Sequence, residues 1–443
     1  MLFVYVFLGM VWLIVTPPFQ NADEQAHYAY VQYLAENGEI PNPDELDKAT
    51  VYNPYIQKVI AALGTDNMVL NSISSLNRDD IANIKDEISR INEPKVTAYH
   101  FPASGYPPLY YAINLPFYYL GDFAGGFVMQ IFAMRFLSLI VSCVTLFYIY
   151  LLGKTFLKSE IMALACAALV GLSPAFLHLS TSINNDNLLI MFFTIGIYVI
   201  TAYSAKMNWR IVLSIIAFGV LAGLTKPQGW FILPIAGFIL GMNYFMSIFI
   251  RRKMKITLLN TILILIALLP FLGPYAIVNF SDIEWKWLSS DYLSNHYLIV
   301  FKQIIKGLVG QFNWGATVLA LPYYYISICL FFVCGAVFIK NYVRHIEEQK
   351  RWYAPLAIVI CFSSVIFLID DYYLLKENEF TLGIQARYFF PVIGCSAVML
   401  MYGLMNLFKN NKYKKFLPYV VIYLMLLFNF LTLINYYIPR FYA

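Results

Sequence analysis

The sequence predicts an all-α polytopic membrane protein with about 11 transmembrane helices and a large first extracytoplasmic loop that contains short helices. Three observations lead to this fold class. Of the 443 residues, 60% are hydrophobic and 12% are charged, whereas soluble proteins carry about 25% charged residues. The apolar residues form long blocks, and the basic residues gather in alternate connections between these blocks.

The apolar blocks approach the length of about 20 residues that a helix needs to cross a bilayer. Lipid offers the backbone no hydrogen bonds, so such segments must be helical. We treat residues 1–443 as one integral membrane domain. The predicted spans are approximately 2–17, 127–152, 159–178, 186–204, 210–225, 228–249, 256–278, 317–339, 352–369, 388–408 and 416–438.

The first predicted span lacks the basic start and the small-residue cleavage site of a signal peptide, so we expect it to be retained. All six cysteines lie within predicted spans. This placement argues against a disulfide framework and against a cysteine-based metal site.

The distribution of lysine and arginine predicts the orientation. Five short connections hold 16 of the 30 basic residues: "GKTFLKSE", "AKMNWR", "RRKMK", "KNYVRHIEEQKR" and "KNNKYKK". The positive-inside rule places them in the cytoplasm. The net charge of +5 therefore anchors a multi-pass protein in the plasma membrane and gives no reason to expect a nucleic-acid partner. The external loops are then roughly 18–126, 179–185, 226–227, 279–316 and 370–387.

The first external loop, residues 18–126, is predicted to be a small helical module. Its middle, "NRDDIANIKDEISRINEPK", has isoleucines at helical spacing. Its start, "ADEQAHYAYVQYL", places Asp23 and His27 four residues apart, on one face of a helix. Tyr28, Val31 and Leu34 would form the apolar stripe of that helix.

Two interpretations of Asp23 and Glu24 are open. A helix that lies flat on the membrane surface often carries acids near its positive end. Alternatively, one of them is a catalytic carboxylate at the bilayer surface. A zinc protease is excluded, because "DEQAH" lacks the first histidine of the two-histidine metal motif.

Two further features precede or enter the second span. In "YPPLYY", two prolines follow Tyr106 and interrupt any helix, and the aromatic residues suit the headgroup region. Arg135 lies inside the span in "IFAMRFLSL". A cation at that depth indicates a functional site, unless its side chain extends to the membrane surface.

Three external turns carry polar residues. "INNDN" places Asp186 at the start of the fourth span, where asparagine and aspartate also serve as helix N-caps. "LTKPQGW" places Lys226 at a proline-bounded break between two spans. "ARYFFP" places Arg387 and Tyr388 at the start of the tenth span.

This topology predicts that carboxylates and cations meet on the outer face. A carboxylate suits a general base, and arginine and lysine suit a phosphate. A substrate with a phosphate headgroup and a lipid tail would place its reactive atom at this depth. The residues expected to converge are Asp23, Glu24, Arg135, Asp186, Lys226 and Arg387.

On these motifs, from about residue 17 to about residue 395, the chain resembles the lipid-phosphate-dependent glycosyltransferases of the C superfamily. That superfamily includes the protein mannosyltransferases and the aminoarabinose transferases of lipid A. The chain is similar, more closely, to a bacterial family of multi-spanning membrane proteins related to it. The shared features are the Asp23–Glu24 pair, "YPPLYY", the arginine of "MRFLS", "LTKPQGW" and "ARYFFP".

The resemblance implies a polyprenyl-phosphate-sugar donor. Asp23 or Glu24 would act as the base or orient the acceptor, and Lys226 and Arg387 would hold the donor phosphate. Where many members have histidine, this chain has Tyr106, with His100 nearby. The remaining candidates for substrate binding are His27, Arg135, Asp186, Tyr106 and Tyr388.

The predicted function is an inverting sugar transfer to a glycan, lipid or protein acceptor. No metal site is predicted, although oxygens of Asp23, Glu24 and Asp186 could hold a divalent cation. One alternative is a transporter or flippase of lipid-linked sugars, which often contains two related halves that this sequence does not show. Another is a polysaccharide polymerase or ligase, whose largest loop usually comes late in the chain.

Overall fold

The computed structural model describes residues 1–21, 23–46, 52–62, 86, 99–203, 208–251, 298–312, 317–344, 352–366 and 385–442. Within these ranges the regular secondary structure is helical apart from two short strands, β1 (Gln311–Phe312) and β2 (Thr317–Val318). The strands pair antiparallel, with Gln311 opposite Val318.

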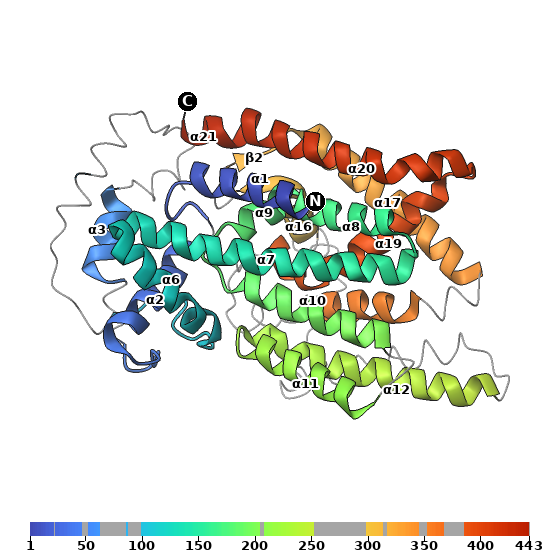
Figure 1. Cartoon of the computed structure of the whole chain (residues 1–443), viewed down its shortest axis with the longest axis horizontal. Helices are drawn as coiled ribbons and strands as arrows, with labels where there is room; N and C mark the ends of the chain where they lie inside the picture. The colour runs from blue at the N-terminus through green and yellow to red at the C-terminus, as the bar shows by residue number, and fades with distance from the viewer. Residues whose placement is uncertain are drawn as a thin grey trace.

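The helices fall into two groups along the chain. The first group, α2, α3 and α6, lies between α1 and the long α7 helix in the chain, and the second group, which includes α1, forms the bundle around α7 (Figure 1). The bounds are α1 (Leu2–Val15), α2 (Glu24–Asn37), α3 (Pro54–Ala62), α6 (Leu109–Gly125), α7 (Phe127–Leu157), α8 (Glu160–Gly171), α9 (Pro174–Ser180), α10 (Asp186–Tyr203), α11 (Trp209–Gly223), η2 (Pro227–Phe231), α12 (Ile232–Arg251), α16 (Leu298–Gly310), α17 (Leu321–Arg344), η8 (Ala386–Val392), α19 (Ile393–Leu407), α20 (Asn411–Thr432), η9 (Leu433–Tyr437) and α21 (Ile438–Phe441).

The structure confirms an all-α membrane protein. Among the described residues, five helices are long and apolar enough to cross a membrane, or six if one bent pair counts as a span. The five are Phe127–Leu157, Asp186–Tyr203, Leu321–Arg344, Ala386–Leu407 and Asn411–Phe441. Shorter apolar helices are Leu2–Val15, Trp209–Gly223, Pro227–Gly241 and Trp352–Ile366. The predicted span 256–278 lies outside the described residues, and helix length alone does not establish the predicted number of spans.

The predicted span 159–178 is bent rather than straight. Helices α8 and α9 meet at an angle of 69°. Pro174 is the first residue of α9 and has no N–H with which to continue α8. The bend turns the chain toward the polar segment that precedes α10.

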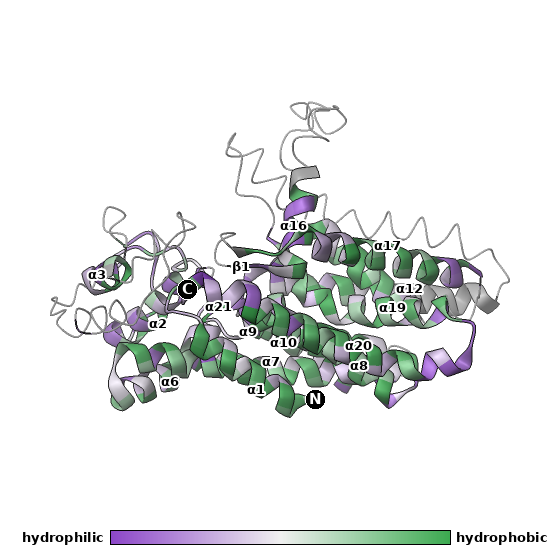
Figure 2. Cartoon of the chain, turned by 90° about the horizontal axis from the view of Figure 1, so that it is seen from above, coloured by the Kyte–Doolittle hydropathy of each residue, from purple (hydrophilic) through white to green (hydrophobic). Residues whose placement is uncertain are grey.

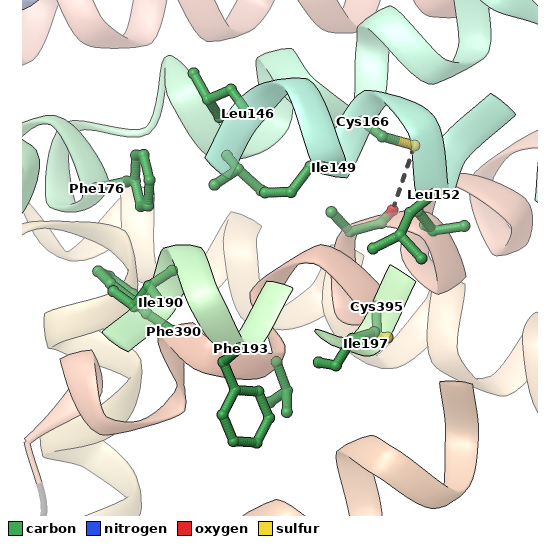
Figure 3. Close-up of a cluster of buried hydrophobic side chains, with 14 of the residues drawn as sticks. Leu146, Ile149, Leu152, Cys166, Phe176, Ile190, Phe193, Ile197, Phe390 and Cys395 are labelled. Carbon is green, nitrogen blue, oxygen red and sulfur yellow. Dashed lines mark hydrogen bonds between the residues drawn. The ribbon is translucent and has the colours of Figure 1, made fainter. Parts of the chain in front are cut away.

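Helix α7 lies at the centre of the bundle and packs against α1, α6, α8, α10 and α19. Figure 3 shows this core, in which side chains of α7 such as Ile149 and Leu152 meet those of α8, α10, η8 and α19. Figure 2 shows the long helices as largely hydrophobic, with hydrophilic residues gathered toward the ends of the bundle.

Glycines let some helices approach closely, as is typical of membrane bundles. A Cβ added at Gly121 of α6 would lie 2.3 Å from the Cα of Gln130 in α7. A Cβ added at Gly403 of α19 would lie 2.1 Å from the carbonyl oxygen of Cys334 in α17. All six cysteines have free thiols in the structure.

Helices α2, α3 and α6 lie together at one end of α7 (Figure 1). Helix α2 does not lie flat on a surface, because residues on all its sides are buried, including Glu24, His27, Tyr28 and Tyr30. Tyr30 stacks on Tyr111 of α6, with ring centroids 3.6 Å apart. Apart from Asp86, the predicted helix in the middle of the loop, residues 77–95, lies outside the described residues.

Candidate functional site

Three polar turns meet beside α2. The first, residues 16–24, joins α1 to α2, the second, residues 181–187, joins α9 to α10, and the third, residues 224–227, joins α11 to η2. The Nδ2 of Asn21 lies 3.5 Å from the carbonyl oxygen of Thr181. The Nδ2 of Asn185 lies 3.3 Å from the carbonyl oxygen of Thr225. These contacts bring together segments that are far apart in the sequence.

The backbone at Asp23 separates the two neighbouring carboxylates. Asp23 is the N-cap of α2 and has φ of 61°, in the left-handed region that aspartate tolerates better than most residues. Glu24 follows with helical geometry. As a result, Asp23 pairs with Arg387 and Glu24 pairs with Arg135.

Arg135 is the centre of a closed network. Its Nε and Nη2 donate to the two carboxylate oxygens of Glu24, at 2.8 and 2.6 Å. Its Nη1 donates to the carbonyl oxygens of Leu13 and Thr16, and its Nη2 also donates to that of Pro17. A guanidinium has five N–H groups, so every donor is used. The side chain is 1% exposed, so the protein encloses it.

Glu24 is equally occupied. Besides Arg135, its oxygens accept hydrogen bonds from the backbone N–H of Phe19 at 2.9 Å and of Ile183 at 3.1 Å. The Nδ2 of Asn21 adds a longer contact of 3.4 Å. The carboxylate is fully buried. Glu24 and Arg135 therefore tie the first and second polar turns to α7, and leave no bonding capacity for a substrate.

A second network lies on the other side of Asp23 and is more open. Arg387 of η8 pairs with Asp23, and its Nε lies 3.5 Å from the Oδ2 of Asp186. The Nζ of Lys226 donates to the Oδ1 of Asp186 at 2.6 Å. The side chain of Asp23 is 36% exposed, whereas that of Asp186 is 3% exposed. A ligand from solvent would thus reach Asp23 first.

Aromatic rings enclose Lys226. Its Nζ lies 5.5 Å from the ring centroid of Tyr106 and 5.1 Å from that of Tyr388, close enough for cation–π attraction. His27 stacks on Tyr106, and its Nδ1 lies 2.9 Å from the hydroxyl of Tyr111. An ammonium has three donors, and Lys226 makes one hydrogen bond among the described residues. It therefore retains donors for an anion.

The surroundings shift three pKa values outside the spans. Burial alone would raise the pKa of Asp23, but the Arg387 guanidinium outweighs burial and holds that pKa below its usual value. Burial would lower the pKa of Lys226, but the Asp186 carboxylate together with Tyr106 and Tyr388 outweighs burial and raises it. Burial lowers the pKa of His27 to about 3. At neutral pH Asp23 and Lys226 are charged and His27 is neutral.

The second polar turn is held by its own asparagines. The Oδ1 of Asn184 accepts a hydrogen bond from the backbone N–H of Asp186 at 2.9 Å, as expected of a residue that caps a helix. The Nδ2 of Asn187 donates to the carbonyl oxygens of Leu179, Ser182 and Asn184. These bonds fix Asp186 in front of Lys226.

The structure thus divides the predicted site residues into two sets. The first set is Asp23, His27, Tyr106, Asp186, Lys226, Arg387 and Tyr388, which lie together. Glu24 and Arg135 form the separate closed network. Since Arg135 occupies Glu24, the three carboxylates considered for a divalent cation are not assembled, and the described residues contain no group of three or more histidine, cysteine or acidic side chains that could hold a metal.

Sequence reasoning missed the residues just before Asp23. Gln20 and Asn21 are each 1% exposed. Phe19 has φ of 62°, which is rare for a bulky residue, and its N–H donates to Glu24. Short polar residues after two prolines are typical of any surface turn, so no local pattern predicts that these ones are buried.

One family model matches most of the chain. It is described as a predicted membrane protein family, DUF2142, and it matches residues 6–395. The matched range includes every member of both ion-pair networks. No curated protein matches the chain.

Proposed function

We propose that this chain, which belongs to the DUF2142 family of predicted membrane proteins, is a membrane glycosyltransferase that moves a sugar from a polyprenyl-phosphate donor to an extracytoplasmic acceptor. The observation that carries the proposal is the open network. A partly exposed carboxylate, Asp23, lies against two buried cations, Arg387 and Lys226, at one end of a bundle of apolar helices.

The proposal includes the predicted topology of about 11 spans with residues 18–126 outside the plasma membrane. In its support, each predicted span within the described residues is largely helical. The polar turns gather at one end of the bundle. Two of the predicted cytoplasmic connections meet away from these polar turns. They line a cavity of about 580 Å³, and its lining includes Ser159, Asn411 and Lys414.

Lys226 and Arg387 would bind the donor phosphate. Arg387 is held near Lys226 by Asp186, whose two oxygens face one cation each. Arginine and lysine bind phosphate by charge-assisted hydrogen bonds. The lipid tail of the donor would extend along the apolar helices, and its sugar would face the polar turns.

Asp23 would be the base. In the free protein Arg387 lowers its pKa, which makes it a weak base. When the donor phosphate binds Arg387, Asp23 loses its counter-ion, and burial raises its pKa toward the value that a base needs near neutral pH. The site would therefore become reactive only when the donor is bound.

The proposed step is an inverting displacement. The acceptor O–H gives its proton to Asp23, and the acceptor oxygen forms a bond to the sugar C1. The bond between C1 and the phosphate oxygen breaks from the opposite face, and its electron pair leaves with the polyprenyl phosphate. Lys226 and Arg387 stabilise the charge that develops on this leaving group.

Transfer in nanodiscs tests the proposal. The purified chain is incubated with radiolabelled polyprenyl-phosphate sugars and membrane extract, and labelled products are isolated. Loss of a general base typically slows a reaction by about 10²–10⁴-fold, so Asp23→Asn should reduce transfer by that factor and retain donor binding. Asp44→Asn, a change at an exposed carboxylate of the same loop, should have no effect.

The same comparison of the wild type with Asp23→Asn, repeated in sealed proteoliposomes, examines the alternative of a transporter. Lys226 and Arg387, whose charges are balanced by two carboxylates, could also carry a phosphate across the membrane without any bond being made or broken. A transporter would retain flux of the lipid-linked sugar into the vesicle interior in the Asp23→Asn variant and yield no labelled product in either protein. That result would contradict the glycosyltransferase proposal.

A further inference from the structure

Buried oxygen atoms without hydrogen-bond donors lie beside the open network. The Oδ1 of Asn21 and the Oδ1 of Asn185 have no partner among the described residues, and the two side chains are 1% and 0% exposed. Gln20 is 1% exposed, and neither its Oε1 nor its Nε2 has a partner there. More than about 90% of buried polar groups in native proteins are paired, so this cluster requires an explanation.

The orientation of both asparagine amides is fixed by their nitrogen atoms. The Nδ2 of Asn185 donates to the carbonyl oxygen of Thr225 at 3.3 Å. The Nδ2 of Asn21 faces the oxygen of Thr181 at 3.5 Å and Oε1 of Glu24 at 3.4 Å. A flipped amide would place oxygen against oxygen in each case. The unpaired atoms are therefore acceptors.

Each acceptor belongs to a turn that also carries a carboxylate of the open network. Asn21 is two residues before Asp23, and Asn185 is directly before Asp186. Arg387 lies between these two carboxylates, and Glu24 joins the two turns through its bond from the N–H of Ile183. The open network thus supplies donors, Lys226 and Arg387, and the turns that carry its two carboxylates supply buried acceptors.

The donors and the acceptors suit different parts of one substrate. A phosphate has only acceptor oxygens near neutral pH, so it binds the cations and would be repelled by the amide oxygens. Sugar hydroxyls donate hydrogen bonds, so they suit the amide oxygens.

We infer that Asn21 and Asn185, with Gln20 beside them, bind the hydroxyl groups of the donor sugar, next to the phosphate at Lys226 and Arg387. The inference rests on the proposed function and adds to it the part of the site that recognises the sugar rather than the phosphate. It assigns the donor specificity of the protein to the first and second polar turns.

Binding of two kinds of ligand, one without a sugar and one with a sugar, to the full chain in nanodiscs tests this inference. The probes are farnesyl phosphate and a set of farnesyl-phosphate hexoses carrying glucose, galactose or mannose. A net hydrogen bond of ordinary strength corresponds to about 3- to 10-fold in affinity. The wild type should bind at least one hexose derivative more tightly than farnesyl phosphate by at least that factor, and this comparison needs no variant.

The variants Asn21→Leu and Asn185→Leu should each lose about 3- to 10-fold in affinity for that hexose derivative and retain their affinity for farnesyl phosphate. The matched control is Asn429→Leu. Asn429 is a buried asparagine whose Oδ1 accepts from the indole of Trp12 and whose Nδ2 donates to Leu172. Its replacement should lower the melting temperature without changing the ratio of the two affinities.

Equal binding of sugar-bearing and sugar-free ligands by the wild type would overturn the inference and show that the amide oxygens hold only water. Failure of the proposed function is a different result. In that case the wild type would not bind farnesyl phosphate, or Lys226→Gln would bind it as tightly as the wild type.

Discussion

Two arginine–carboxylate pairs lie next to each other in this protein, and they differ in what they leave unused. Glu24 and Arg135 are both buried, and every donor of the guanidinium is bonded within the protein. Asp23 and Arg387 also pair, but Asp23 is 36% exposed. The first pair can only hold the fold together, whereas the second can exchange a partner for a ligand.

The comparison shows that the role of an ion pair depends on how many hydrogen bonds its side chains can still form with a ligand. The carboxylates are adjacent in the sequence and identical in chemistry. A buried charge is tolerated only when its hydrogen bonds are complete, and the Glu24 network meets this condition by recruiting backbone groups from two turns. In the Asp23 network, Asp23 is partly exposed and Lys226 makes one hydrogen bond among the described residues, and this difference makes it the better candidate for binding and catalysis.

The largest expected effect comes from breaking the closed pair. Arg135→Met leaves Glu24 buried without its partner, a change that typically costs about 3–5 kcal/mol. The folded, monodisperse fraction in detergent should fall sharply, and the melting temperature should drop. Lys154→Met, which removes an exposed pair with Glu160, should change neither. If Arg135→Met folded as well as the wild type and lost only activity, the distinction between the two pairs would fail.

A smaller effect is expected from the open network. Lys226→Gln removes a charged hydrogen bond worth about 1.5–3 kcal/mol, or about 10- to 100-fold in affinity for farnesyl phosphate. The fold should persist, because Arg387 lies 3.5 Å from the other oxygen of Asp186. Isothermal titration in nanodiscs measures the affinity, with Lys154→Gln as the control. A collapse of stability like that of Arg135→Met would place Lys226 among the structural residues instead.

The smallest effect concerns His27, which stacks beside the open network. Burial lowers its pKa to about 3, while the unfolded chain takes up a proton below about pH 6.5. Its contribution to stability is therefore complete above pH 6.5 and is lost as the pH falls toward 3. At pH 5 the loss is about 2 kcal/mol.

Melting temperatures between pH 7 and pH 5 measure this loss. His27→Asn should have a shallower decline than the wild type over that interval. Tyr111→Phe, which removes the hydrogen-bond partner of the ring and leaves the histidine buried, should retain the steep decline. Equal slopes in the wild type and His27→Asn would show that His27 is solvated, and that this side of the site is more open than the structure indicates.

The sequence was most informative where a physical constraint acts over a short stretch. Apolar blocks predicted the helices, and the proline after Lys226 predicted the break between α11 and η2. The bend between α8 and α9 was missed, because Pro174 was included within one predicted span although its ring prevents a straight helix.

The candidate site was only partly predictable. A cation inside an apolar block, Arg135, indicated that it must have a partner, but no local pattern indicated which carboxylate. The choice depends on the left-handed backbone of Asp23, which sends adjacent side chains in different directions. The unpaired oxygens of Asn21 and Asn185 depend on contacts between turns that lie 160 and 40 residues apart in the chain, and no single-sequence pattern contains that information.

The closed network also constrains the order in which the chain is assembled in the membrane. Glu24 receives hydrogen bonds from Arg135, 111 residues later, and from Ile183, 159 residues later. During synthesis, the first helix therefore enters the bilayer well before its neighbouring carboxylate can be neutralised. Arg135 is likewise synthesised before the second turn. We expect residues 16–24 to stay hydrated, or to be shielded by the insertion machinery, until α10 begins to emerge.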